Sequence, residues 1–381
     1  MKHITILGAG YAGMLAALRL HKRAHVTLIS REATFVERIR LHQAAAGQSI
    51  RVRPIADMLR GTGVTFIQAN IAHIDAEAHT LSLIGTNGTP SEHAHETLIY
   101  ALGSHIDRDA LPGVRAHAQT LDPRGFAAVT AIAARGGRIV LIGGGLTGIE
   151  AASELAEAHP HAHITLITQG EIGAGLSDGG REHVRSVFAH LGVTLIENRR
   201  VTQIDANTIV TDNDTILTDG VLWAGAFAVP SLARDAGITV NARGQIVVDA
   251  ALRSVSHPDI LVAGDSACVP GVRMACATAM PMGAHAADVA LGSDTPFRFG
   301  FLVQCISLGR RDGLIQFVNA DDSPQPRILT GRAAATFKEL ICHFTVAALG
   351  VERRLPGIYA WRKSDLGVES ASDGVWAKGI A

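Results

Sequence analysis

The chain contains one pattern twice: a short β-branched run, a glycine-rich turn, and then an apolar repeat at helical spacing. The first copy begins near Lys2 with ITILGAGYAG and the second near Arg138 with RIVLIGGGLTG. A second β-branched run, VTLIS or ITLIT, completes each βαβ unit. Such glycines keep the turn tight, let the backbone approach a pyrophosphate and allow helix and strand to pack closely. The repeat therefore predicts two doubly wound α/β domains, each with a phosphate-binding turn. The glycines concerned are Gly8, Gly10 and Gly13 in the first copy and Gly143, Gly145 and Gly148 in the second.

Neither copy has the acidic residue that commonly ends the second strand of such a unit and holds the ribose hydroxyls. Ser30 stands at that place in the first copy, with Glu32 two positions later, and Thr168 stands there in the second, ahead of Glu171. A hydroxyl or a shifted carboxylate can bind the ribose, and both glutamates can also be solvated loop charges. Because no arginine directly follows ITLIT, the sequence leaves NADH and NADPH as open alternatives.

A third motif, HPDILVAGDSA, is a buried strand that ends in Gly264 and Asp265 and precedes a helix-compatible run. A carboxylate at a strand end accepts hydrogen bonds from a sugar-like chain, and a helix N-terminus favours negative charge on a bound ring. The motif therefore predicts a further contact to a bound ligand.

Charge and cysteine usage exclude several classes of protein. The formal net charge of -1 and the lack of any Lys/Arg run exclude the electrostatic footprint of a nucleic-acid binder. The cysteines contain no CxxC pair, so we predict no zinc or other metal site and no disulfide framework, and we expect a cytoplasmic protein. We expect no cleaved signal and no membrane span, because the first strand begins by His3 and charges interrupt the longest apolar run. The cysteines are Cys268, Cys276, Cys305 and Cys342.

In chain order, the motifs resemble those of flavoproteins with two dinucleotide-binding domains, the pyridine nucleotide-disulfide oxidoreductase superfamily. Within it the chain looks most like type II NADH dehydrogenases and apoptosis-inducing-factor-like proteins, over essentially its whole length. The matching segments are ITILGAGYAGMLAA, TLIYALGS, LPGVRAHA, RIVLIGGGLTGIEAASELAE, VLWAGAFAVPSLARDAGI, GQIVVDAALRSVSHPDILVAGDSA and ISLGRRDGLIQF with ILTGRAA.

The resemblance implies two Rossmann-like domains, with the NAD(P) domain inserted in the FAD domain, and a small C-terminal α+β interface domain. We expect the FAD domain in residues 1–115 and 246–295, the NAD(P) domain in 116–245 and the interface domain in 296–381. FAD is the expected cofactor, and NADH or NADPH is the expected cosubstrate.

The resemblance also implies roles for particular residues. Asp265 is expected to hold the FAD ribityl chain or phosphate. Glu150 is expected to lie near the stacked nicotinamide and flavin as a catalytic residue, the alternative being a charged residue on a helix surface. The further residues expected to contact the cofactors are Gly8, Gly10, Ala12, Gly13, Ser30, Arg31, Arg40, Ala101, Gly103, Gly143, Gly145, Thr147, Gly148, Thr168, Gly225, Gly264, Ala279 and Met280.

The stretch FVERIRLHQ stands about where related enzymes keep a redox cysteine, and this chain has no cysteine before Cys268. The resemblance therefore disfavours disulfide reductases and sulfide:quinone oxidoreductases, and the flavin is expected to pass its electrons directly to an external acceptor. His42 is predicted near the flavin as a catalytic proton donor, because the unperturbed pKa of histidine lies near neutrality. A surface or core histidine is the alternative. We also predict that Glu37, Arg38 and Arg40 form a buried or half-buried ionic cluster.

The acceptor side corresponds to CATAMPMG, which has Ala277 and Pro281 where type II dehydrogenases have glutamines. Methionines here predict an apolar wall for a flat acceptor, or alternatively core filling beneath a helix. We therefore predict an FAD-dependent NAD(P)H dehydrogenase that reduces a quinone-like small molecule. The alternatives are a flavin-dependent oxidase or dehydrogenase of a biosynthetic metabolite and a redox-gated interaction flavoprotein.

The segment GRAAATFKELICHFTVAALG predicts one closing helix with an apolar stripe. We expect this stripe to pack on its own domain or in a homodimer. Peripheral membrane association is the less favoured alternative, because the basic polar face is thin. The stripe consists of Phe337, Leu340, Ile341, Phe344 and Ala348.

Overall fold

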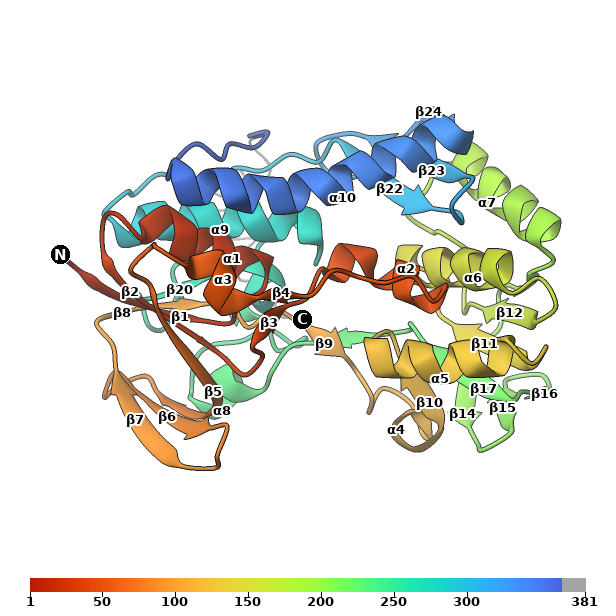
Figure 1. Cartoon of the computed structure of the whole chain (residues 1–381), viewed down its shortest axis with the longest axis horizontal. Helices are drawn as coiled ribbons and strands as arrows, with labels where there is room; N and C mark the ends of the chain where they lie inside the picture. Colours follow the sequence, from red (N-terminus) through yellow and green to blue (C-terminus); the bar gives the residue numbers. More distant parts are fainter. Residues whose placement is uncertain (365–381) are drawn as a thin grey trace.

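The computed structural model describes residues 1–364; the rest of the predicted interface domain, 365–381, lies outside the described residues. Two sheets with parallel strands stand side by side, each with its own helices (Figure 1). A small antiparallel sheet packs between α6 of the second unit and the long helix α10 (Gly331–Arg354), which runs across both halves (Figure 1). This arrangement places two strand-turn-helix units in one molecule.

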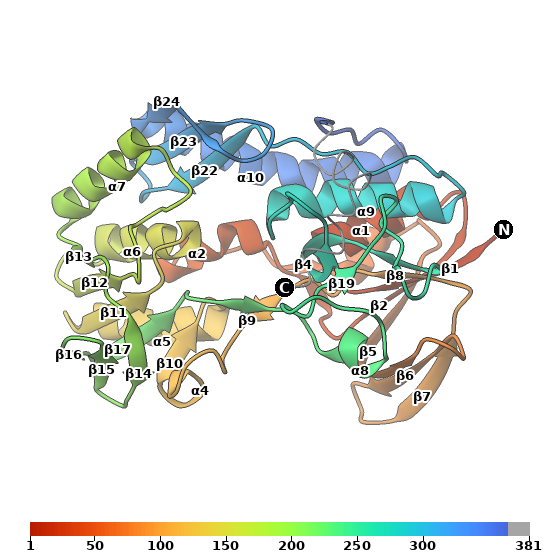
Figure 2. The same cartoon turned by 180° about the vertical axis from the view of Figure 1, so that it is seen from behind.

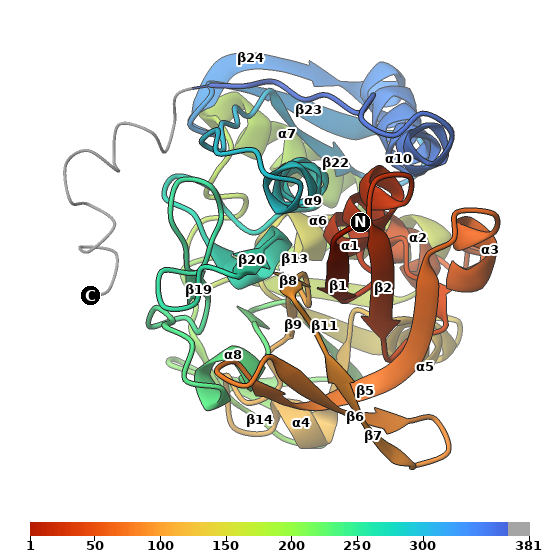
Figure 3. The same cartoon turned by 90° about the vertical axis from the view of Figure 1, so that its left-hand side faces the viewer.

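The first sheet has the strand order β20-β8-β1-β2-β5-β6-β7. Its central strand β1 is buried along ITIL, as expected for a parallel strand covered on both faces. β5 first pairs with β2 in parallel and from Ala69 onward pairs with β6 in antiparallel, so an antiparallel meander projects from the parallel part (Figure 3). Helices α1 and α9 pack against one another beneath α10 (Figure 2). The bounds are β1 His3–Leu7, α1 Tyr11–Leu20, β2 His25–Ser30, β5 Thr65–Asp75, β6 Thr80–Gly85, β7 Pro90–Ala94, β8 Thr97–Tyr100, β20 Ile260–Val262 and α9 Cys276–Ala290.

Between β2 and β5 the chain makes short elements that reach toward the second sheet. The 3-10 helix η1 leads directly into α2, which packs against α5 and α6 of the other unit (Figure 1). Residues of the first unit therefore contact the second glycine-rich helix. The bounds are β3 Thr34–Phe35, η1 Arg38–Arg40, α2 Leu41–Ala45, β4 Arg53–Pro54 and α3 Ile55–Leu59.

The second sheet is parallel throughout, in the order β10-β17-β11-β12-β13. Its hydrophobic core contains Leu141, Leu155 and Leu166, each fully buried, between the sheet and its helices. The bounds are α4 Val114–His117, β10 Ala118–Thr120, α5 Pro123–Ala133, β11 Arg138–Ile142, α6 Leu146–Ala158, β12 His163–Ile167, α7 Asp178–Leu191, β13 Thr194–Ile196 and β17 Gly220–Trp223, with an antiparallel meander of β14 Val201–Ile204, β15 Thr208–Thr211 and β16 Thr215–Leu217.

The chain passes from the first unit to the second through β9 and returns through β18, and these two strands pair in antiparallel. The segment after the second crossing already belongs to the core of the first unit, because Ala233 and Ile238 are buried there. We therefore propose that the second part of the FAD domain begins near Pro230 rather than at 246. The bounds are β9 His105–Ile106, β18 Phe227–Ala228, α8 Leu232–Asp235, β19 Ile246–Val247, η2 Gly264–Ser266 and β21 Ala267–Cys268.

Helix α10 closes the structure, but its apolar stripe faces outward. Phe337, Leu340 and Phe344 are 43%, 60% and 64% exposed. These three residues do not pack on their own domain as expected, whereas Ala348 of the same stripe does, with 8% exposed, and packing in a homodimer stays a prediction. The buried face instead carries Lys338 and Glu352, whose charges are paired with buried or half-buried partners on α6 and α1, so burial is tolerated. Before α10 lie β22 Val303–Ser307, β23 Gly313–Val318 and β24 Pro324–Thr330.

Candidate active site

A cavity of about 350 Å³ opens at the carboxyl ends of β1, β2, β8 and β20. Parallel strands deliver their following turns to one edge of a sheet, and ligands of doubly wound proteins bind there. Residues that are far apart in the sequence therefore lie together around this cavity. The predicted cofactor contacts that line the cavity are Gly8, Gly10, Ala12, Ser30, Arg31, Ala101, Gly103, Gly264, Asp265 and Ala279.

The first glycine turn has the shape that a pyrophosphate needs. Gly8 has φ +96°, and an added Cβ would lie 2.4 Å from the Ala101 carbonyl oxygen. A Cβ on Gly13 would lie 1.8 Å from the Gly8 carbonyl oxygen, so this position serves helix-strand packing and does not line the cavity. A Cβ on Gly10 would meet nothing within 4 Å, which leaves space directly before the N-terminus of α1. This open cradle fits the phosphates of FAD.

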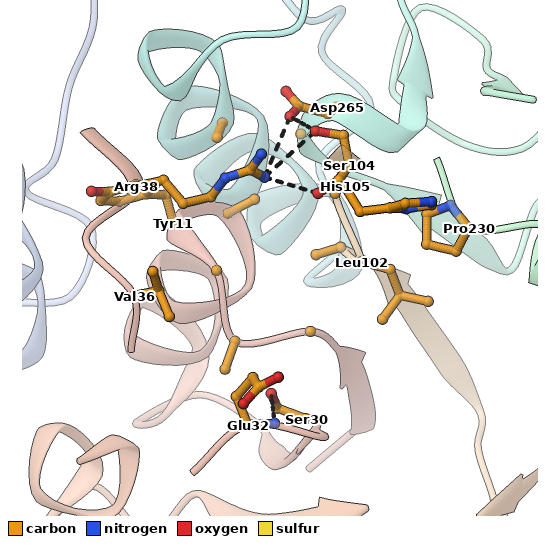
Figure 4. Close-up of a pocket in the computed structure, with 18 of the residues that line it drawn as sticks. Tyr11, Ser30, Glu32, Val36, Arg38, Leu102, Ser104, His105, Pro230 and Asp265 are labelled. Carbon is orange, nitrogen blue, oxygen red and sulfur yellow. Dashed lines mark hydrogen bonds and ion pairs between the residues drawn. The ribbon is translucent and has the colours of Figure 1, made fainter. Parts of the chain in front are cut away.

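Arg38, Ser104 and Asp265 form a polar cluster in the wall of the cavity (Figure 4). The Ser104 hydroxyl donates to Asp265 Oδ2 at 2.6 Å, and Arg38 Nη1 donates to the Ser104 carbonyl oxygen at 2.9 Å. Arg38 Nη1 also lies 4.0 Å from Asp265 Oδ2. The cluster offers a cation, a hydroxyl and a carboxylate to the sugar-like and phosphate parts of a dinucleotide.

Besides Gly13, two predicted contacts from the FAD domain, Arg40 and Met280, lie away from the cavity. The guanidinium of Arg40 is held by Glu37 at 3.2 Å and Glu339 at 2.6 Å, and Met280 is buried in the core. The predicted ionic cluster thus contains Glu37 and Arg40, whereas Arg38 points into the cavity. Sequence reasoning missed Tyr11, Val36, Arg38, Ser104, His105, Pro230, Leu232 and Cys276 as cavity residues, although Ser104 ends the matching segment TLIYALGS.

The second glycine turn repeats this geometry at the carboxyl end of β11. Gly143 has φ +123°, and an added Cβ would lie 2.6 Å from the Ala224 carbonyl oxygen. A Cβ on Gly148 would lie 2.0 Å from the Gly143 carbonyl oxygen, while one on Gly145 would meet nothing within 4 Å. The N-terminus of α6 is thus open to a phosphate in the same way. Thr147 lies in the first turn of α6, Thr168 directly follows β12, and Gly225 stands two residues after β17.

His42, Glu150 and Lys338 meet where α2, α6 and α10 converge. Lys338 Nζ lies 3.0 Å from Glu150 Oε1, and His42 Nδ1 lies 3.5 Å from Glu150 Oε2. The Ser307 amide also donates to Glu150 Oε1 at 3.0 Å. All three charged or titratable side chains are at least nine-tenths buried. The structure therefore brings the two predicted catalytic residues together, although neither lines the described cavity.

This buried network shifts several pKa values. Burial alone would raise the pKa of Glu150, but the charge of Lys338 holds it below its ordinary range. Burial lowers the pKa of His42 to about 4, so the near-neutral pKa on which its predicted role rested is not retained. Burial also raises the pKa of Glu154 to about 7, against the opposing charge of Arg310. Glu154 Oε1 lies 3.9 Å from His42 Nε2.

Burial raises the thiol pKa of three of the four cysteines, Cys276, Cys305 and Cys342. All four are free, and Cys276 alone among them lines the cavity described within residues 1–364. Burial raises the pKa of the Cys276 thiol to about 11, so it stays protonated at neutral pH and is a poor nucleophile. The Cys268 sulfur accepts from the Asn241 side-chain amide at 3.3 Å.

Comparison with known proteins agrees with this geometry. Residues 2–287 match the family described as pyridine nucleotide-disulphide oxidoreductase. An NADH dehydrogenase-like protein of Mycobacterium tuberculosis is 25% identical over 329 residues, covering 75% of this chain and 79% of that protein. A type II NADH:quinone oxidoreductase of Staphylococcus haemolyticus is 26% identical over 399 residues, covering 92% and 96% of the two chains.

A solved structure shares the fold. The sulfide:quinone oxidoreductase of Aquifex aeolicus superposes with a TM-score of 0.79 at 18% identity, covering 94% of this chain and 93% of that one. At this identity the likeness shows the fold alone. The predictions of family, of two Rossmann-type domains and of FAD with NAD(P)H as cofactors are confirmed. The chain belongs to the pyridine nucleotide-disulphide oxidoreductase family and is an NAD(P)H-dependent flavin oxidoreductase.

Proposed function

We propose that this protein is an NAD(P)H dehydrogenase that passes electrons to a quinone-like small molecule without any protein disulfide. The observation that carries the proposal is the cavity beside the first glycine turn, which has only one thiol in its described wall, and burial raises the pKa of that thiol to about 11. Without a thiol relay, the electrons must go directly to an external acceptor. A relative over nearly its whole length is a type II NADH:quinone oxidoreductase, which supports a quinone-like acceptor.

The overall reaction is that NAD(P)H, one proton and a quinone give NAD(P)⁺ and a hydroquinone. Bound FAD supplies the two-electron transfer between the nicotinamide and the acceptor. The first glycine turn would hold FAD and the second would hold NAD(P)H, because Gly10 and Gly145 leave the helix N-termini free for phosphates.

The buried network of Glu150, Lys338, His42 and Glu154 holds protons next to this site. The pKa of the cavity-lining Cys276 is raised mainly by burial, and the charges of Lys338 and Glu150 also contribute to it. A carboxyl with a pKa of about 7 can release and regain a proton at working pH, so we assign that role to Glu154. The neutral His42 ring lies between Glu150 and Glu154 and positions their carboxylates.

The test is anaerobic stopped-flow mixing of the yellow protein with NADH and, separately, with NADPH. Oxidised-flavin absorbance should bleach quickly with at least one nucleotide and return after a pulse of a short-chain quinone. The steady-state pattern should be ping-pong, with nicotinamide leaving before the acceptor binds. Bleaching without recovery would overturn the quinone-like acceptor, and no bleaching with either nucleotide would point to an oxidase of another metabolite.

The outward apolar stripe of α10 suggests where the protein encounters a quinone-like acceptor. By length and composition α10 could cross a membrane, yet its other face is packed on the protein. We propose that the exposed stripe lies on a lipid surface, which also dissolves apolar quinones. Arg354 stands exposed in the last turn, where it can reach anionic headgroups, whereas Arg353 donates to the Asp57 carbonyl oxygen on the protein side. The exposed residues are Phe337, Leu340, Phe344 and Val351, with Leu355 following the helix.

We expect the wild-type protein to sediment with vesicles that contain anionic lipid and to be released by the double substitution Leu340→Gln and Phe344→Gln. Both side chains are more than half exposed, so the exchange should leave folding and FAD content unchanged. Each buried side chain of this kind is worth about 1.5–3 kcal/mol, so their loss should weaken binding at least about 100-fold. If the double variant instead converts a dimer to a monomer while vesicle binding persists, the stripe is a subunit interface.

A further inference from the structure

Two histidines and one aspartate meet at the end of the first sheet that is remote from the FAD cavity. His79 lies in the turn between β5 and β6, His95 lies between β7 and β8, and Asp259 directly precedes β20. One ligand atom from each residue lies within 4.8 Å of the other two. The cavity stands at the carboxyl ends of β8 and β20, whereas this cluster stands at their amino ends, so the two sites are distinct.

The unpaired ring nitrogens of the buried His95 indicate a bound ligand. Its side chain is buried, with 7% exposed, and neither ring nitrogen has a hydrogen-bond partner among the described residues. Asp259 Oδ2 is also buried without a hydrogen bond there, although it lies 3.2 Å from His79 Nδ1. Native proteins rarely leave buried polar atoms unpaired, and those that remain commonly face a water or an ion. The unpaired atoms here converge on one point.

We propose that His79, His95 and Asp259 bind a divalent transition-metal ion of the Zn²⁺ class. Two imidazoles and a carboxylate are a common three-ligand set for zinc, with water in the fourth position. In a tetrahedral site with bonds of about 2.0–2.1 Å, neighbouring ligand atoms stand about 3.4 Å apart. The present ligand atoms lie within 4.8 Å of one another, so side-chain rotations that shorten a separation by at most about 1.4 Å would reach that geometry.

Such an ion would tie the antiparallel meander to the parallel part of the sheet. His79 and His95 flank the strands of the meander, and Asp259 starts a strand of the parallel part. A second pair, His257 with Glu77 at 3.3 Å, already bridges the same two regions. Since the ligands would come together only in the folded chain, binding should add to the stability of the folded state.

The test is the zinc content of the FAD-bound protein after treatment with EDTA, exposure to Zn²⁺ and desalting. Wild-type protein should retain one equivalent of Zn²⁺ more than His95→Gln, Asp259→Asn and His79→Asn. His79 has φ +55°, a conformation that asparagine tolerates, so His79→Asn removes the ligand with little effect on folding. FAD content reports whether each variant is folded.

His343→Gln is the matched control, because His343 is 71% exposed on α10, far along the chain from the cluster. This variant should keep the extra equivalent and the rise in thermal midpoint that Zn²⁺ gives to the wild type. Thiols and other histidines bind equally in all variants and cancel in the comparison. Equal zinc content in the wild type and in a folded cluster variant, or no retained zinc in the wild type, would overturn the proposal.

Discussion

Replacing Gly10 by valine is expected to give a folded protein that no longer retains FAD. Gly10 has an ordinary φ of -73°, and a Cβ added there meets no atom within 4 Å, so the fold does not oppose the substitution. The new side chain would instead enter the space before α1 where the phosphates bind. Losing two hydrogen bonds to a charged group, at about 1.5–3 kcal/mol each, weakens binding by about 100-fold or more. The ratio of flavin to protein absorbance after desalting measures the effect.

Gly145→Val is the matched control in the second unit. Gly145 also has an ordinary φ, -74°, and open space around its Cβ, but it precedes α6 instead of α1. This variant should keep its FAD. Its flavin should no longer bleach quickly with NAD(P)H, because nucleotide binding should be weakened about as much as FAD binding is in Gly10→Val. Retention of FAD by Gly10→Val, or loss of FAD from Gly145→Val, would contradict the assignment of the two turns.

The two glycine turns could be predicted from sequence because their geometry is local. Gly8 and Gly143 need a positive φ within a stretch of six residues, and nothing distant changes that requirement. Which of Arg38 and Arg40 lines the cavity could not be predicted from the local sequence. They are the two ends of the one-turn helix η1, and Glu339, almost three hundred positions later, takes the guanidinium of Arg40. Only the folded chain shows which arginine remains for the cavity.

The orientation of α10 was predicted wrongly for the same kind of reason. An apolar stripe is normally buried and charged positions are normally exposed. Here Lys338 pairs with Glu150, and Glu352 pairs with Arg19, so two charged residues of α10 lie on its buried face. Their sequence separations exceed 150 residues, and no periodicity within the helix signals such partners. The cluster of His79, His95 and Asp259 escaped notice likewise, because metal-ligand spacing was sought only within short motifs.

Lys338→Met is expected to destabilise the protein by about 3–5 kcal/mol, since removing one partner of a buried ion pair leaves an uncompensated charge. Methionine fills a similar volume, so packing changes little. The carboxylate of Glu150 would keep only its bond from the Ser307 amide and its contact with the neutral His42. Chemical unfolding of the FAD-bound protein measures the loss. The double variant Glu150→Gln with Lys338→Met removes both charges and should recover most of the stability.

The pH dependence separates a lost charge partner from lost packing. In the wild type the pKa of Glu150 is lowered, so its contribution is present above the ordinary pKa of a glutamate and is lost as pH falls through the lowered value. In Lys338→Met, burial is no longer opposed by the lysine, and the pKa of Glu150 should rise. A raised carboxyl pKa costs stability as pH increases, so the deficit relative to wild type should grow between about pH 5 and pH 8. A deficit that is equal at both ends of this range would mean that Lys338 acts through packing alone and that the charge of Glu150 is held by other groups.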